Sequence, residues 1–293
     1  MAFRFTRREP LTVGVRRLAD AELTAAAALL RDDASLPALR VHGARKATKR
    51  VRALLRLVRA GLAAPRFRAA NLGLRDAARG LAAARDAAVA LATFDDLVPE
   101  PDDVFAPIRA ALHAATDPSD RPHSGLGPEI LARAADDLDG ARAHISAALA
   151  ERTLTWDHLE AGLRDSYGGG RTAMRAAFAY PGDEAFHAWR KRVKDLWYQT
   201  LLLENACEPL LSAQAHLLAD LGDRLGDDHD LAVLAAQPAC VGLPALAERI
   251  TARRRALRLS AWQLGQQVHA ERPRAFLRRL GAYWQIWRAI EPV

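Results

Sequence analysis

One arrangement of a histidine and three cations occurs twice in the sequence. The motif His-x-x-Arg-Lys-x-x-Lys lies once within VHGARKATKRVRALLRLVR (residues 41–59) and once within FHAWRKRVKDLWYQT (residues 186–200). The two copies start 145 residues apart, at His42 and His187. Guanidinium groups form bidentate hydrogen bonds with phosphate oxygens, and ammonium groups contact them as point charges. The repeated motif therefore suggests a surface that binds a polyanion, and a linear phosphate chain suits it.

A helical projection at 100° per residue places the motif cations on one face of each segment. Apolar residues such as Val51 and Leu54, or Trp189 and Val193, lie on the opposite face, so each segment predicts a helix with a core side and a cationic side. Like charges at i,i+4 destabilise an isolated helix, which favours an anion that neutralises them. The candidate residues of the two stripes are His42, Arg45, Lys46, Lys49, Arg52, Arg56, His187, Arg190, Lys191 and Lys194.

The distribution of lysine sharpens this interpretation. The chain has 38 Arg and only four Lys, and the four are Lys46, Lys49, Lys191 and Lys194. A general drift toward basic residues would not collect every lysine at equivalent positions of one motif. These positions therefore favour a compact, strongly hydrated ammonium group over a planar guanidinium.

The overall charge agrees with a polyanionic partner. The chain of 293 residues has a formal net charge of +7 and a sequence pI near 10.0, and 50% of its residues are hydrophobic. Such a composition is typical of a globular protein whose positive field attracts polyanions. Residues 34–75 contain eleven Lys or Arg and no acid. The two cysteines, Cys207 and Cys240, form no CxxC motif, so we expect neither a zinc site nor a disulfide framework.

Periodicity predicts an all-α fold with an internal duplication. A second pair of segments, ARGLAAARDAAVAL and DRLGDDHDLAVL, aligns Asp86 with Asp230 at an offset of 144. We therefore expect a single domain over residues 11–290, built from two pseudo-symmetric halves at about 11–150 and 151–290. Gly168–Gly170 is expected to be a hinge, and residues 116–127 a flexible loop. The expected helices are 11–31, 39–60, 68–93, 104–114, 128–150, 156–167, 171–179, 183–204, 209–236, 243–270 and 273–290.

With both motifs, both aligned segments and the ending ERPRAFLRRLGAYWQIWR, the chain resembles the CHAD (conserved histidine α-helical domain) family from about Leu11 to Ile290. The resemblance implies two four-helix-bundle-like halves that bind inorganic polyphosphate through a basic groove or pore lined by the motif cations. No Glu-x-Glu-x-Lys strand of a triphosphatase accompanies it. Asp195 departs from the repeat, since the first copy has Arg50 there. The further ligand residues that it implies are Arg16, Arg17, Arg164, Arg171, Arg175, Arg253, Arg254, Arg274 and Arg278.

Two other functions compete with this interpretation. The same cations would hold the backbone of a nucleic acid without sequence preference, although the first motif has no aromatic residue for base stacking. His229-Asp230, beside Asp227 and Asp228, resembles the metal-binding pair of helical phosphohydrolases, but no Asp follows Asp230. We expect Asp227 and Asp228 to face solvent and Asp230 either to orient a motif cation or to cap packing.

No P-loop or nucleophile elbow is present, so we expect no catalytic residue, metal or cofactor. The basic start is not followed by the apolar core of a signal peptide, and no run reaches the length of a membrane span. The expected location is cytoplasmic, where polyphosphate granules would be a partner. The sequence assigns no oligomeric state.

Overall fold

The computed structural model describes residues 3–81, 83–100, 102–116, 127–150 and 152–290. Within these residues the chain forms α-helices joined by short 3₁₀ turns and loops, with no strand, which confirms the all-α class. The α-helices are α1 (Leu11–Arg31), α2 (Pro37–Leu57), α3 (Ala64–Gly80), α4 (Ala83–Leu97), α5 (Ala106–Ala114), α6 (Pro128–Leu149), α7 (Trp156–Ala179), α8 (Asp183–Leu203), α9 (Glu208–Ala235), α10 (Pro244–Val268) and α11 (Pro273–Ala289).

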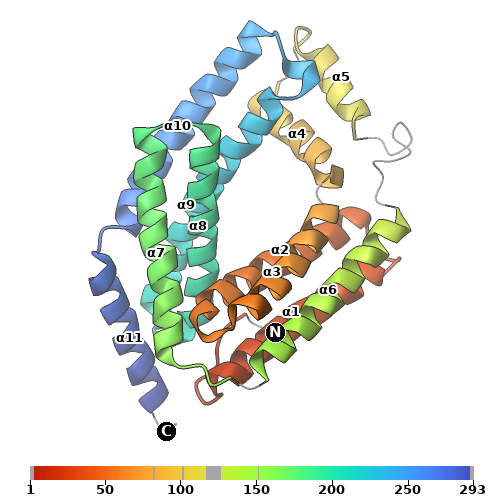
Figure 1. Cartoon of the computed structure of the whole chain (residues 1–293). Helices are drawn as coiled ribbons and strands as arrows, with labels where there is room; N and C mark the ends of the chain where they lie inside the picture. The colour runs from red at the N-terminus through yellow and green to blue at the C-terminus, as the bar shows by residue number, and fades with distance from the viewer. Residues whose placement is uncertain (1–2, 82, 101, 117–126, 151, 291–293) are drawn as a thin grey trace.

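The helices form two bundles. In the first bundle α1 packs against α2 and α6, and α3 packs against α2 and α6. In the second bundle α7 packs against α8, α8 against α9, and α9 against α10, while α11 lies along α7. Figure 1 shows the two bundles diverging like two sides of a triangle, with α4 and α5 on the third side.

The motif helices α2 and α8 join the bundles. They pack against each other, and α7 also contacts α2. One apolar cluster runs through both bundles and includes Leu54 of α2 and Trp189 of α8, both fully buried. The contact with α7 is close at Gly162, where an added Cβ would lie 2.1 Å from the carbonyl oxygen of Leu57. Only glycine fits this crossing, because any side chain would collide with the backbone of α2.

The α4–α5 pair belongs to the second bundle in space, although it precedes α6 in sequence. A separate apolar cluster joins Phe94 of α4 and Ile108 of α5 to Leu234 of α9 and Ile250 of α10. Helices α4 and α5 are thereby attached to α9 and α10. Arg249, for example, stacks over the ring of Phe105 at 4.9 Å.

Two sequence-based boundaries are wrong. The helix expected over residues 68–93 is two helices, because Leu81 is buried in the first cluster and Phe94 in the second, and one straight helix cannot serve both. The break expected at Gly168–Gly170 does not occur, since α7 is continuous. Gly170 instead allows close packing, since a Cβ there would lie 3.0 Å from the ring of His269.

Some expectations fall outside the described part of the chain. Residues 117–126 of the expected loop are not described, and nor are the side chains of Arg85 and Asp86 in the first copy of the aligned segment. The internal duplication therefore stays a prediction. Among the described helices, none is long and apolar enough to cross a membrane.

Candidate anion-binding surface

Helix α2 has the two faces that its sequence predicts. Val51 and Leu54 are fully buried, whereas His42, Lys46 and Lys49 are exposed. The helix begins at Pro37, whose fixed φ and missing N–H suit the first turn. A cationic stripe therefore lies on the outer face of a helix whose inner face is locked in the core.

The arginines of the α2 stripe are held by neighbouring helices. Arg45 Nη1 donates to the carbonyl oxygen of Ala78 at 3.0 Å, and Arg52 Nε donates to Asn71 Oδ1 at 3.0 Å, both on α3. Burial of Arg52, together with the neighbouring charge of Arg56, lowers the pKa of its guanidinium from the ordinary value. These contacts fix the direction of the long side chains before any ligand binds, which reduces the entropy lost on binding.

Helix α8 presents its stripe against α9. Its core side is confirmed, since Trp189, Val193 and Leu196 are buried. Two glycines of α9 lie beneath the cations: a Cβ on Gly222 would be 2.8 Å from Lys194 Cε, and one on Gly226 would be 3.2 Å from Arg190 Nη2. The absence of side chains at these two positions makes the space in which the α8 cations lie.

Lys194 of the α8 stripe contacts two side chains. Its Nζ lies 3.0 Å from Asp223 Oδ1 and 4.5 Å from the centroid of the Trp197 ring. Lys191, in contrast, is exposed. The ammonium of Lys194 is therefore stabilised by a carboxylate and by an aromatic face.

Asp195, which departs from the repeat, connects the two stripes. Its Oδ1 accepts a hydrogen bond of 2.6 Å from Arg56 Nη1 of α2. Burial raises the pKa of Asp195 by more than the Arg56 guanidinium lowers it. The corresponding Arg50 of α2 also leaves its stripe, donating to Glu22 Oε1 of α1 at 2.9 Å. The sequence marks both positions as exceptions to the stripe but does not indicate their partners.

The two motif histidines differ in their surroundings. His42 is exposed, whereas His187 stacks on His229 of α9 with ring centroids 4.6 Å apart. The Nδ1 atom of His187 is buried, and among the described residues it has no hydrogen-bond partner. Burial and the charge of Lys191 lower the pKa of His187 to about 4, so its ring is neutral near pH 7. Burial and Arg190 lower the pKa of His229 as well.

One residue of the acidic cluster of α9, Asp228, joins α9 to α10. Asp227 is exposed as expected, but the expectation that Asp228 faces solvent is wrong. The side chain of Asp228 is only 2% exposed, and its Oδ1 accepts hydrogen bonds of 2.9 Å from both Arg254 Nε and Arg258 Nε of α10. The hydrogen bonds from these two guanidinium groups offset the cost of burying the Asp228 side chain. Within the described residues, no group of three or more possible metal ligands occurs.

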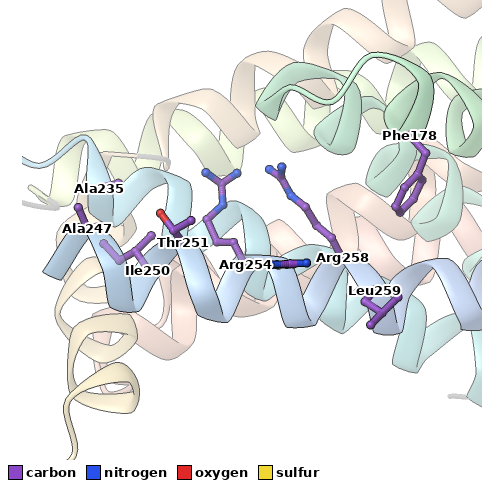
Figure 2. Close-up of a pocket in the computed structure, with 9 residues that line it drawn as sticks. Phe178, Ala235, Ala247, Ile250, Thr251, Arg254, Arg258 and Leu259 are labelled. Carbon is purple, nitrogen blue, oxygen red and sulfur yellow. The ribbon is translucent and has the colours of Figure 1, made fainter. Parts of the chain in front are cut away.

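Beside this cluster lies a pocket of about 570 Å³ on α10. Figure 2 shows Arg254 and Arg258 extending from one face of α10, with Ile250 and Leu259 along the same helix and Phe178 across the pocket. Asp183 accepts hydrogen bonds from the same two arginines. These two guanidinium groups therefore connect α10 to α9 through Asp228 and to the start of α8 through Asp183.

The nine further arginines that the resemblance implies do not gather in one place. Arg17 pairs with Glu9 (Nε–Oε2, 2.8 Å), and Arg254 pairs with Asp228. Arg16 lies in a small pocket between α1 and α6, while Arg175 on α7 and Arg253 on α10 are exposed. The remaining four line a groove between α7 and α11: Arg164, Arg171, Arg274 and Arg278.

These features define an all-α protein of two bundles that meet at a pair of cationic helices. The chain belongs to the CHAD domain family, whose model matches residues 15–239. The match includes α2 and α8 with both motifs, and it ends before α10 and α11, to which the sequence resemblance extends. A comparison with curated proteins finds no match.

Proposed function

We propose that the protein is a non-enzymatic binder of inorganic polyphosphate and that the cations of α2 and α8 contact the phosphate chain. The observation that carries the proposal is the placement of lysine. All four lysines of the chain lie on two helices that pack against each other, and three of them, Lys46, Lys49 and Lys191, are exposed. A long phosphate chain offers the repeated charge that such a double stripe would neutralise.

The family supports the same ligand. The resemblance of the chain to the CHAD family implies a basic groove or pore that binds polyphosphate. The motif cations that would line it lie on α2 and α8. A protein with this function would associate with polyphosphate granules in the cytoplasm. Binding should also stabilise the fold, because it favours the native state and relieves repulsion among the stripe cations.

Non-specific binding of nucleic acid is the second candidate, and the aromatic residues argue against it. Trp189 is fully buried and Tyr198 is 5% exposed, so neither presents a face to a base. Trp197 is half-buried and lies beneath Lys194. Single-stranded nucleic acid is held by bases stacked on aromatic rings among the cations, and α2 has none.

A phosphohydrolase is the third candidate, and Asp228 argues against it. A metal would compete with Arg254 and Arg258 for the carboxylate that they already share. Removing that carboxylate from the arginines would leave buried charge unpaired, which is costly.

The test is the variant K46A/K49A/K191A/K194A, which removes four positive charges from the stripes. We expect its affinity for long-chain polyphosphate to fall by about 30-fold or more at low salt, with helicity unchanged by circular dichroism. The matched control is R8A/R66A/R133A/R152A, which removes the same charge from exposed positions outside α2 and α8. Equal losses in the two variants would contradict a specific site on the motif helices.

A further inference from the structure

A second concentration of positive charge lies away from α2 and α8. A groove of about 1010 Å³ runs between α7 and α11. This volume lies at the upper end of the range for small-molecule sites, and it is far larger than one phosphate needs. Three of its cations follow residue 239, where the family match ends. The charged residues that line the groove are Arg164, Arg171, Arg272, Arg274, Arg278 and Glu160.

The charges of the groove are not balanced by acids. Glu160 is the one carboxylate among its lining residues, and it is paired with Arg164 at 2.5 Å. Five guanidinium groups and one carboxylate leave an excess of four positive charges (5 − 1). Within the described part of the chain, no carboxylate forms an ion pair with Arg272, Arg274 or Arg278. A site of this kind attracts a ligand with several negative charges.

The two helices that form the groove are joined by several contacts. Tyr167 of α7 stacks on Phe276 of α11 with centroids 3.9 Å apart, and its hydroxyl donates to the carbonyl oxygen of Glu271 at 2.9 Å. Arg171 Nη1 donates to the same oxygen at 3.0 Å. The carboxylate of Glu271 is turned to Arg279 at 2.6 Å. The turn before α11 is therefore fixed by α7, and its acid is neutralised by a residue that does not line the groove.

The spacing of the arginines sets the size of the ligand. At 1.5 Å per residue, Arg164 and Arg171 are separated by about 10 Å along α7, and Arg274 and Arg278 by about 6 Å along α11. A short chain of linked phosphates can contact more of these arginines at once than a single phosphate can. Three linked phosphates carry about four negative charges near neutral pH, since an internal unit contributes one and a terminal unit up to two. This matches the excess charge of the groove.

The type of cation also differs from that of the motif helices. The groove contains arginine and no lysine, whereas all four lysines lie on α2 and α8. Planar guanidinium groups bind phosphate oxygens in pairs and can also stack on a planar ring. We propose that the α7–α11 groove is a second anion site, independent of the motif stripes, which binds a short oligophosphate group. Inorganic tripolyphosphate and a nucleoside triphosphate both carry that group.

The experiment uses the full chain in the K46A/K49A/K191A/K194A background, so that binding to the stripes is weakened. Tripolyphosphate, adenosine triphosphate and orthophosphate are titrated by calorimetry at low salt. We expect saturable binding of the first two ligands, and a loss of about tenfold or more in affinity when R274A/R278A is added. Adding R133A/R152A instead removes the same charge from exposed positions outside the groove, and it should change the affinity by less than about twofold.

Equal effects of the two arginine pairs, or orthophosphate binding as tightly as tripolyphosphate, would overturn the proposal. If adenosine triphosphate binds more tightly than tripolyphosphate, the groove also contacts the nucleoside. If the two ligands bind equally, the groove contacts only the phosphates. Either ranking supports the site and assigns its ligand. Failure of this proposal can be distinguished from failure of the proposed function. Substituting the four lysines tests the binding of long-chain polyphosphate, whereas substituting Arg274 and Arg278 tests the groove.

Discussion

Helices α2 and α8 carry the same motif, but their cations lie in different surroundings. On α2 the histidine and both lysines are exposed, and Arg52 is held by α3. On α8 the histidine stacks on α9, and Lys194 contacts both a carboxylate and an indole ring. The spacing of the motif sets which face the cations share, and the neighbouring helix sets how far each one can move.

The source of the difference is the surface on which each stripe lies. The glycines of α9 at positions 222 and 226 let Lys194 and Arg190 lie close to the helix backbone. The α2 and α8 stripes are linked by the hydrogen bond that Arg56 donates to Asp195. In our account α2 therefore presents three exposed motif residues to the phosphate chain, His42, Lys46 and Lys49, whereas α8 presents one, Lys191.

The largest effect on stability is expected from the link between the stripes. Replacing Asp195 by Ala should lower the free energy of unfolding by about 2–3 kcal/mol, because Arg56 and the partly buried Arg52 lose their buried counter-charge. Replacing Asp223 by Ala removes the ion pair of Lys194, but Asp223 is 69% exposed, so about 0.5 kcal/mol or less is expected. Urea unfolding of both variants measures the difference. Similar losses would show that Asp195 does not connect the bundles.

The next effect concerns the two pairs of lysines. K46A/K49A should weaken polyphosphate binding by about tenfold or more, because both ammonium groups are exposed. K191A/K194A should weaken it by about threefold, since Lys194 already has two partners. The two double variants remove equal charge and serve as controls for each other in a fluorescence titration. The reverse order would mean that the α8 stripe is the main contact.

The smallest effect is the dependence of stability on pH. The folded protein holds the pKa of His187 at about 4, below its ordinary value of 6.5, so between these values the unfolded chain binds the proton and the folded protein does not. Stability from this residue is therefore present above pH 6.5 and is lost as the pH falls toward 4.

In the variant His187→Gln, the free energy of unfolding should fall by about 1 kcal/mol less than in the wild type between pH 7 and pH 4. This figure is smaller than the full pKa shift would give, because the His187 ring is partly exposed and solvent screens its charge. The control is His42→Gln, which changes the exposed histidine at the equivalent motif position. Thermal melts at several pH values between 4 and 7 give the slopes. If His187→Gln and the wild type lose stability in parallel, the stacked ring does not titrate as we infer.

Local patterns predicted much of the fold. The faces of α2 and α8 followed from apolar residues at helical spacing, and α1 begins and ends at the predicted residues, Leu11 and Arg31. The break between α3 and α4 was not visible, because it depends on which of two cores each apolar residue joins. Gly168–Gly170 was misinterpreted for a related reason, since glycine serves a turn and a close helix contact equally well.

The sequence predicted which residues belong to the candidate surface, but it did not predict their contacts or their burial. The lysine distribution identified the four ammonium positions, yet nothing local indicated that Asp195 would meet Arg56, which lies 139 residues away in sequence. The burial of Asp228 was missed because its partners, Arg254 and Arg258, lie on another helix. The clustering of arginines on α10 was the signal available for it.

The central claim is that the two stripes form a shaped site for a phosphate chain. The most direct measurement is a competition in which labelled long-chain polyphosphate is bound and then challenged with DNA and RNA at equal phosphate concentration, at low and near-physiological salt. Electrostatic binding must weaken with salt for every ligand. Our account predicts that at the higher salt polyphosphate stays bound and neither nucleic acid displaces it. Equal displacement by DNA or RNA would contradict the claim and would make the stripes a general cationic surface.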